Sequence, residues 1–190
     1  MGEGCPSKPL QNSPASRGDP PDPLLTRQTG FMLERVNDIS WSSFSQPPWN
    51  GEGTVPSALV LLSNCTSKSE AVIAYHRVLY ALGNNHAGTY YPVVLQALPF
   101  LGEIVQQGTP AAREGALDVL IDLIGSFCPE PGFEKIDTAG ARSVDLEMSL
   151  LRAAQGLRPV LTSIEMTDQT SSRMGELARD LLELLDEETS

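Results

Sequence analysis

Residues 83–126 read GNNHAGTYYPVVLQALPFLGEIVQQGTPAAREGALDVLIDLIGS, and this stretch decides the fold. A turn rich in Gly and Asn is followed by an apolar helix that contains Pro99 and by a second apolar helix that begins at Pro110. In both helices apolar residues recur at i, i+3, i+4 and i+7, a pattern that predicts one buried face on each. A helix pair of this size cannot bury that face alone, so neighbouring pairs must stack against it.

The segments on either side resemble partial copies of this unit. A shift of 60 residues places Leu117 on Leu177, and a shift of 42 in the other direction places Leu101 on Leu59. We therefore predict an all-α fold, a short α-solenoid of about three helix pairs, over residues 55–84, 97–126 and 157–185. The unequal shifts leave 18 extra residues around 128–146, where we expect a polar loop. Insertions in repeat proteins often map to the binding face, but an inert loop is an equally good interpretation.

The N-terminal residues differ from the rest in composition. Residues 1–28 are rich in Pro and Ser and poor in apolar side chains, which predicts a flexible tail, and residues 29–190 are expected to form one domain. The apolar residues of 31–44 predict a cap over the first helix pair, since a solenoid must cover its first exposed face. After the insertion, residues 145–166 predict one helix, bent at Gly156 and Pro159.

The composition excludes several classes of partner. A net charge of −11 and a pI near 4.5 argue against nucleic acid, which is bound through a basic surface. No stretch approaches the ~18 apolar residues of a membrane span, and no signal peptide is recognisable. The three cysteines have no spacing typical of metal sites or disulfide frameworks. We expect a cytoplasmic protein without a membrane partner.

Catalytic and metal-binding patterns are absent from the sequence. The only histidines are His76 and His86, and there is no Ser/His/Asp set, phosphate-binding Gly-rich loop or HExxH motif. We therefore expect no enzymatic activity, no metal site and no cofactor.

Acidic residues recur at helical spacing in two places. Glu114, Asp118 and Asp122 would line one side of the helix after Pro110, and a similar stripe on the last helix contains Glu176, Asp180 and Glu183. Like charges at i and i+4 cost a few tenths of a kcal/mol per pair, an effect that solubility alone can justify. Alternatively, both stripes face a shared concave side that attracts a basic protein.

Aromatic residues supply the other candidate contacts. The turn before Pro92 either presents His86, Tyr90 and Tyr91 to a partner or is a helix-ending turn whose tyrosines pack inward. Because aromatic side chains carry much of the energy of interfaces, Trp41 and Trp49 are further candidate anchors.

The order of several short motifs resembles a group of bacterial HEAT-repeat proteins. The motifs are Trp-Ser-Ser-Phe at 41–44, Val-Pro at 55–56, His-Ala-Gly-Thr-Tyr at 86–90 and Pro-Phe-Leu at 99–101. Ala87 stands where that group usually has Gln, and the insertion after Cys128 is a second departure. The resemblance implies a HEAT-like, non-enzymatic binding protein, many of which act as immunity proteins. It therefore implies an antitoxin that occludes the active site of a basic toxin such as a nuclease. A scaffold, an adaptor or a regulatory subunit of a complex is the alternative.

Overall fold

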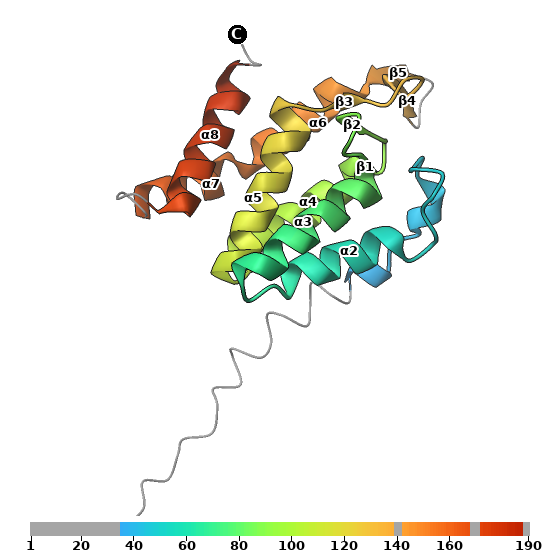
Figure 1. The fold of residues 1–190 in the computed structure, drawn as a ribbon. Coiled ribbons are helices and arrows are strands. Elements are labelled where there is room, and N and C mark those ends of the chain that lie inside the picture. Colours follow the sequence, from blue (N-terminus) through green and yellow to red (C-terminus); the bar gives the residue numbers. More distant parts are fainter. Residues whose placement is uncertain (1–34, 139–141, 168–171, 188–190) are drawn as a thin grey trace, which may run out of the picture.

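The computed structural model describes residues 35–138, 142–167 and 172–187. The described residues are mostly helical, which is compatible with the predicted all-α class (Figure 1). The predicted tail of residues 1–28 and the first residues of the predicted cap lie outside the described residues.

Six of the helices form three consecutive pairs. The first pair is α2 (Thr54–Ser63) and α3 (Lys68–Leu82), the second is α4 (Val94–Gln107) and α5 (Pro110–Gly125), and the third is α7 (Arg158–Thr167) and α8 (Arg173–Glu187). The two helices of each pair pack against each other. These pairs coincide with the three units that the apolar periodicity predicted.

Contacts between pairs run mainly through the second helix of each pair. Helix α3 packs against α5, and α5 packs in turn against α8. Helix α2 contacts α4, and α4 contacts α6 (Leu146–Ala154). Helix α5 touches both neighbouring pairs, and five of its apolar residues are fully buried: Ala112, Ala116, Leu117, Val119 and Leu120.

The buried face of α3 does not follow the spacing of its large apolar residues. Val72 and Tyr75 stand at helical spacing with Val78, Leu79 and Leu82, but Val72 is half exposed, and Ala71 and Ala74 are buried instead. A Cβ on Gly115 of α5 would lie 3.4 Å from the Cβ of Ala71. Small residues on both helices therefore allow α3 and α5 to approach closely.

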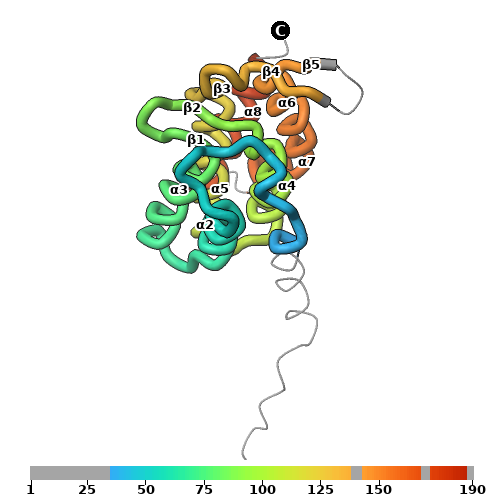
Figure 2. The backbone as a smooth tube through the Cα atoms, turned by 90° about the vertical axis from the view of Figure 1, so that its right-hand side faces the viewer, coloured from blue at the N-terminus to red at the C-terminus, as the bar shows by residue number. Residues whose placement is uncertain are grey.

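Short strands join the segment between α3 and α4 to the insertion. Strand β1 (Gly83–Asn84) pairs antiparallel with β2 (Thr89–Tyr90), and β2 pairs in parallel with β3 (Cys128–Pro129). Gly88 has φ of 68°, as expected for a tight turn, whereas Gly83, which follows α3, has an extended backbone. The turn between β1 and β2 projects from the side of the molecule (Figure 2).

The insertion is not the polar loop that we expected. It contains β3 and an antiparallel hairpin of β4 (Lys135–Thr138) and β5 (Arg142–Asp145). The Glu130 amide donates to the Tyr90 carbonyl at 2.8 Å, and the ring of Phe133 packs on that of Tyr91. The first residues of the insertion therefore supply backbone and aromatic partners to Tyr90 and Tyr91.

The segment after the insertion is divided rather than bent. Helix α6 ends at Ala154, and a 3₁₀ turn, η2 (Gln155–Leu157), separates it from α7. Pro159 lies in the first turn of α7, where a missing amide donor costs nothing, while Pro99 is inside α4. Pro159 therefore begins a new helix and does not, as we had expected, bend a continuous one.

The cap covers a different helix from the one expected. The Trp41 indole, in the 3₁₀ turn η1 (Trp41–Ser43), donates to the Val36 carbonyl at 2.7 Å and packs on Phe100 of α4. Arg35 forms an ion pair with Glu103, also on α4, at 2.6 Å. On the first pair, large apolar side chains of α2 and α3 stay exposed, among them Leu61 and Ile73.

The start of α3 offers a test of the local sequence signals. The Ser67 hydroxyl accepts from the Glu70 amide, and the Glu70 carboxylate accepts from the amides of Thr66 and Ser67, which holds the pKa of Glu70 below its usual value. Replacing Ser67 with alanine should lower the free energy of unfolding by about 1 kcal/mol, because one amide loses its cap. Urea denaturation followed by circular dichroism measures this. The Ser57→Ala change on the exposed side of α2 is the control, and an equal loss in both variants would contradict a capping role.

Candidate protein-binding groove

A groove of about 350 Å³ lies between the second helices of the three pairs. We call it the α3–α5–α8 groove. Its lining comes from α3 (Lys68, Ala71, Val72, Tyr75 and His76), from α5 (Glu114, Gly115, Asp118, Ile121 and Asp122) and from α8 (Arg173, Leu177 and Asp180). Residues from three segments far apart in the sequence therefore form one surface.

The acidic stripe of α5 lies in this groove. Glu114, Asp118 and Asp122 are spaced four residues apart, so their side chains follow one side of the helix, and all three are half-buried. Asp180 adds a fourth carboxylate from α8. Glu176 and Glu183, which we predicted on the same surface, are exposed on α8 and do not line the groove.

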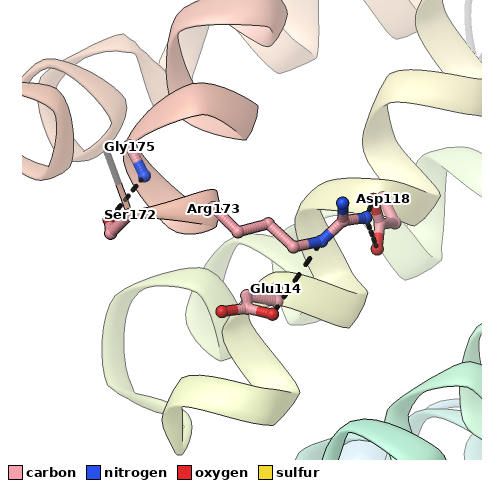
Figure 3. Close-up of polar contacts among 5 residues, drawn as sticks. All are labelled: Glu114, Asp118, Ser172, Arg173 and Gly175. Atoms are coloured by element: carbon pink, nitrogen blue, oxygen red, sulfur yellow. Dashed lines mark hydrogen bonds and ion pairs between the residues drawn. The ribbon is translucent and has the colours of Figure 1, made fainter.

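Arg173 already neutralises part of this stripe. From the start of α8 its Nη2 donates to both carboxylate oxygens of Asp118, at 2.8 and 3.0 Å, and its Nε lies 3.9 Å from Glu114 (Figure 3). Hydrogen bonding to Asp118 raises the pKa of Arg173 further above its usual value. The Ser172 hydroxyl accepts from the Gly175 amide at 3.2 Å and so fixes the turn from which Arg173 extends.

Sequence reasoning missed this contact. The shift of 60 residues treated Arg173 as the counterpart of Arg113, but Arg113 instead donates through Nε to the Val105 carbonyl within its own pair, at 2.8 Å. The repeat pattern placed the two arginines at equivalent positions. Their hydrogen-bond partners differ because a different helix lies next to each of them. The one available signal was that Arg173 is a cation at the start of a helix otherwise rich in carboxylates.

Asp122 has a partner on the opposite side of the groove. The Tyr75 hydroxyl of α3 donates to its Oδ2. Burial is the larger cause, and the hydrogen bond to Asp122 the next, of a pKa of Tyr75 above its usual value. The tyrosine therefore remains a hydrogen-bond donor at neutral pH. The Tyr75 ring also meets the imidazole of His76 edge-on, with ring centroids 4.8 Å apart.

The groove combines an apolar floor with a negative rim. Ala71, Val72, Ile121 and Leu177 supply apolar surface, and four carboxylates stand against two cations, those of Lys68 and Arg173. Asp180 makes no ion pair with any residue that the structure describes. The groove therefore has two uncompensated negative charges above a surface that can contact an aliphatic chain.

Most of the predicted aromatic anchors lie elsewhere. Contrary to the expectation of exposed anchors, Trp41, Tyr90 and Tyr91 are buried, because they pack against α4 and the insertion. This agrees with the inward-packing interpretation of the turn. His86 is exposed in the turn between β1 and β2, where the Asn84 side chain accepts from its backbone amide at 3.1 Å. Trp49 is exposed beside α3, away from the groove.

Neither a metal site nor a membrane span is found in the described part of the chain. No cluster of three or more His, Cys, Asp or Glu side chains there could hold a metal ion. No helix of the described residues combines the length and the hydropathy needed to cross a bilayer.

Comparison with known proteins finds no family model, no curated protein and no solved structure that matches the chain.

Proposed function

We propose that the chain is a protein-binding domain with the architecture of a short HEAT-like α-solenoid. The packing order α3, α5, α8 supports this proposal, because in such an architecture the second helices of successive pairs lie next to one another and line one side. The agreement between the predicted units and the three helix pairs supports it as well.

The partner that we propose is a basic protein bound in the α3–α5–α8 groove. The single observation that carries the proposal is that α5 and α8 direct carboxylates into one groove whose floor is apolar. A lysine or arginine side chain has an aliphatic stem that can lie on Val72 and Leu177 and a charged end that can reach Asp180. Negative potential in a concave site also speeds the encounter with a positively charged partner.

In its most specific form, the proposal is an immunity protein that neutralises a cognate toxin. The carboxylates would take the places that phosphates occupy in the substrate groove of a cationic nuclease, and the bound chain would occlude the toxin's active site. The resemblance to bacterial HEAT-repeat proteins supports this form. A scaffold, an adaptor or a regulatory subunit is the alternative, and the exposed apolar side chains on α2 and α3 favour it because they offer a second surface.

Charge reversal at Asp180 tests the groove. With the tagged chain as bait in an extract of the native host, Asp180→Lys should reduce recovery of a basic partner about tenfold, because a groove with two excess negative charges becomes neutral. Glu183→Lys makes the same charge change on the same helix outside the groove lining and should leave recovery unchanged. The pull-down is done at about 0.1 M and at about 0.5 M salt, because salt screens attraction between charges. Mass spectrometry then identifies and quantifies the recovered partner.

The outcomes separate the alternatives. A basic partner that stops growth when produced without this chain supports the immunity function, and a harmless partner supports a scaffold or regulatory subunit. Equal recovery with both variants, independent of salt, would contradict the use of the groove.

A further inference from the structure

Exposed apolar side chains gather on the first helix pair, away from the groove. Among the described residues, Trp49, Leu61, Ile73 and Tyr80 are 42%, 44%, 58% and 46% exposed. Leu61 and Tyr80 line a second groove, of about 630 Å³, together with Arg77. We call Trp49, Leu61, Ile73, Arg77 and Tyr80 the outer patch.

The aromatic part of the outer patch is held in position. The rings of Trp49 and Tyr80 stack with centroids 5.4 Å apart, and the Trp49 indole donates to the Tyr80 carbonyl at 3.1 Å. The side-chain amide of the neighbouring Asn50 donates to the Ala81 carbonyl at 2.7 Å, which attaches this loop to the end of α3. A preorganised aromatic pair loses little conformational entropy on binding, and such residues often act as anchors in interfaces.

The outer patch and the α3–α5–α8 groove lie on different sides of α3. Ile73, Arg77 and Tyr80 are four and three residues apart and therefore share one helix face. Ala71 and Tyr75, which meet Gly115 and Asp122 of α5, lie on another. A partner on the outer patch would thus leave the groove open.

The charge of the outer patch is opposite to that of the chain. Arg77 is the only charged residue that lines its groove, and it makes no ion pair with any described residue. The chain as a whole carries a net charge of −11. A carboxylate that reaches this patch therefore meets a cation and no acidic residue of the groove lining, while a second copy of the chain would bring another −11 close to the first.

We propose that the outer patch binds an amphipathic helix of a partner protein, one that presents apolar side chains flanked by a carboxylate. A shallow groove between two packed helices suits the apolar face of a third helix, with contacts spaced at i, i+3 and i+4. The carboxylate pairs with Arg77, and the aliphatic side chains cover Leu61, Ile73 and the Trp49–Tyr80 pair. This surface is independent of the α3–α5–α8 groove, which attracts a partner of the opposite charge.

A displayed library of helical peptides tests this proposal. The peptides carry a fixed leucine face and random polar positions, and they are selected against the full chain. Selected peptides should be enriched in Asp and Glu. Their dissociation constants, measured by fluorescence anisotropy, should rise at least about tenfold with Ile73→Glu and with Arg77→Glu. Met148 and Arg152 form a similar exposed pair, four residues apart on α6, so Met148→Glu and Arg152→Glu are matched controls that should leave the affinity unchanged.

Several outcomes would contradict binding of an acidic amphipathic helix at the outer patch. Failure to enrich any peptide, enrichment of Lys and Arg, or equal weakening by the α6 controls would each overturn the proposal. Sedimentation would reveal a concentration-dependent dimer, and a dimer that Ile73→Glu abolishes would assign the patch to a second copy of the chain and likewise overturn it.

Discussion

Replacing Gly83 with alanine should destabilise the fold by about 3 kcal/mol or more, a large share of the 5–15 kcal/mol typical of a domain. A Cβ at this position would lie 1.9 Å from the carbonyl oxygen of Thr89 and 2.7 Å from the Cα of Tyr90. Both are backbone atoms of β2, so the clash cannot be relieved by a change of side-chain rotamer. The backbones of β1 and β2 would have to move apart. Urea denaturation followed by circular dichroism measures the loss.

Gly102 provides the matched control. A Cβ there would lie 2.6 Å from Cδ2 of Leu157, the end of a flexible side chain that can change rotamer. Alanine also favours the interior of α4 by about 1 kcal/mol relative to glycine. The Gly102→Ala change should therefore alter the free energy of unfolding by no more than about 1 kcal/mol. Equal effects at both glycines would mean that β1 and β2 do not approach as closely as described.

The Leu120→Ala variant should lose about 3 to 5 kcal/mol of stability. Leu120 is fully buried on α5, which packs against α3, α4 and α8, so several neighbours would have to move together to fill the space. Truncating a buried leucine loses both its burial and the contacts around the cavity left behind. The change should shift the urea midpoint of the whole helical signal, because α5 connects all three pairs.

Leu61→Ala is the control for this core change. Its side chain is nearly half exposed on α2, so the same truncation removes less buried surface and should cost no more than about 1 kcal/mol. Similar losses at Leu61 and Leu120 would contradict the central position of α5.

The helices themselves could be predicted from local patterns. The apolar period predicted the three pairs, and Pro110 correctly marked where α5 begins. Pro56 and Ser67 are similar local signals at the starts of α2 and α3. These signals are local, because a cap or an N-terminal proline acts within one turn of its own helix. The acidic stripe of α5 could be predicted for the same reason.

Other features could not be predicted because they depend on contacts between residues far apart in the sequence. Hydrophobicity alone ranked Val72 above Ala71, but the close approach of Gly115 made the small residue the buried one. Strand β3 and the position of Phe133 in the insertion could not be predicted because their partners, β2 and the ring of Tyr91, lie about 40 residues earlier in the chain.

The sequence by itself determined where the helices of the first two pairs lie and that each has an apolar face, because both follow from periods of three to four residues. Only the tertiary structure decided which apolar face is covered and which carboxylates already have a cation. Arg173 meets Asp118 across 55 positions, and the segment expected to cap α2 and α3 packs on α4 instead. Such choices depend on distances between helices, and the pattern within a single helix carries no information about them.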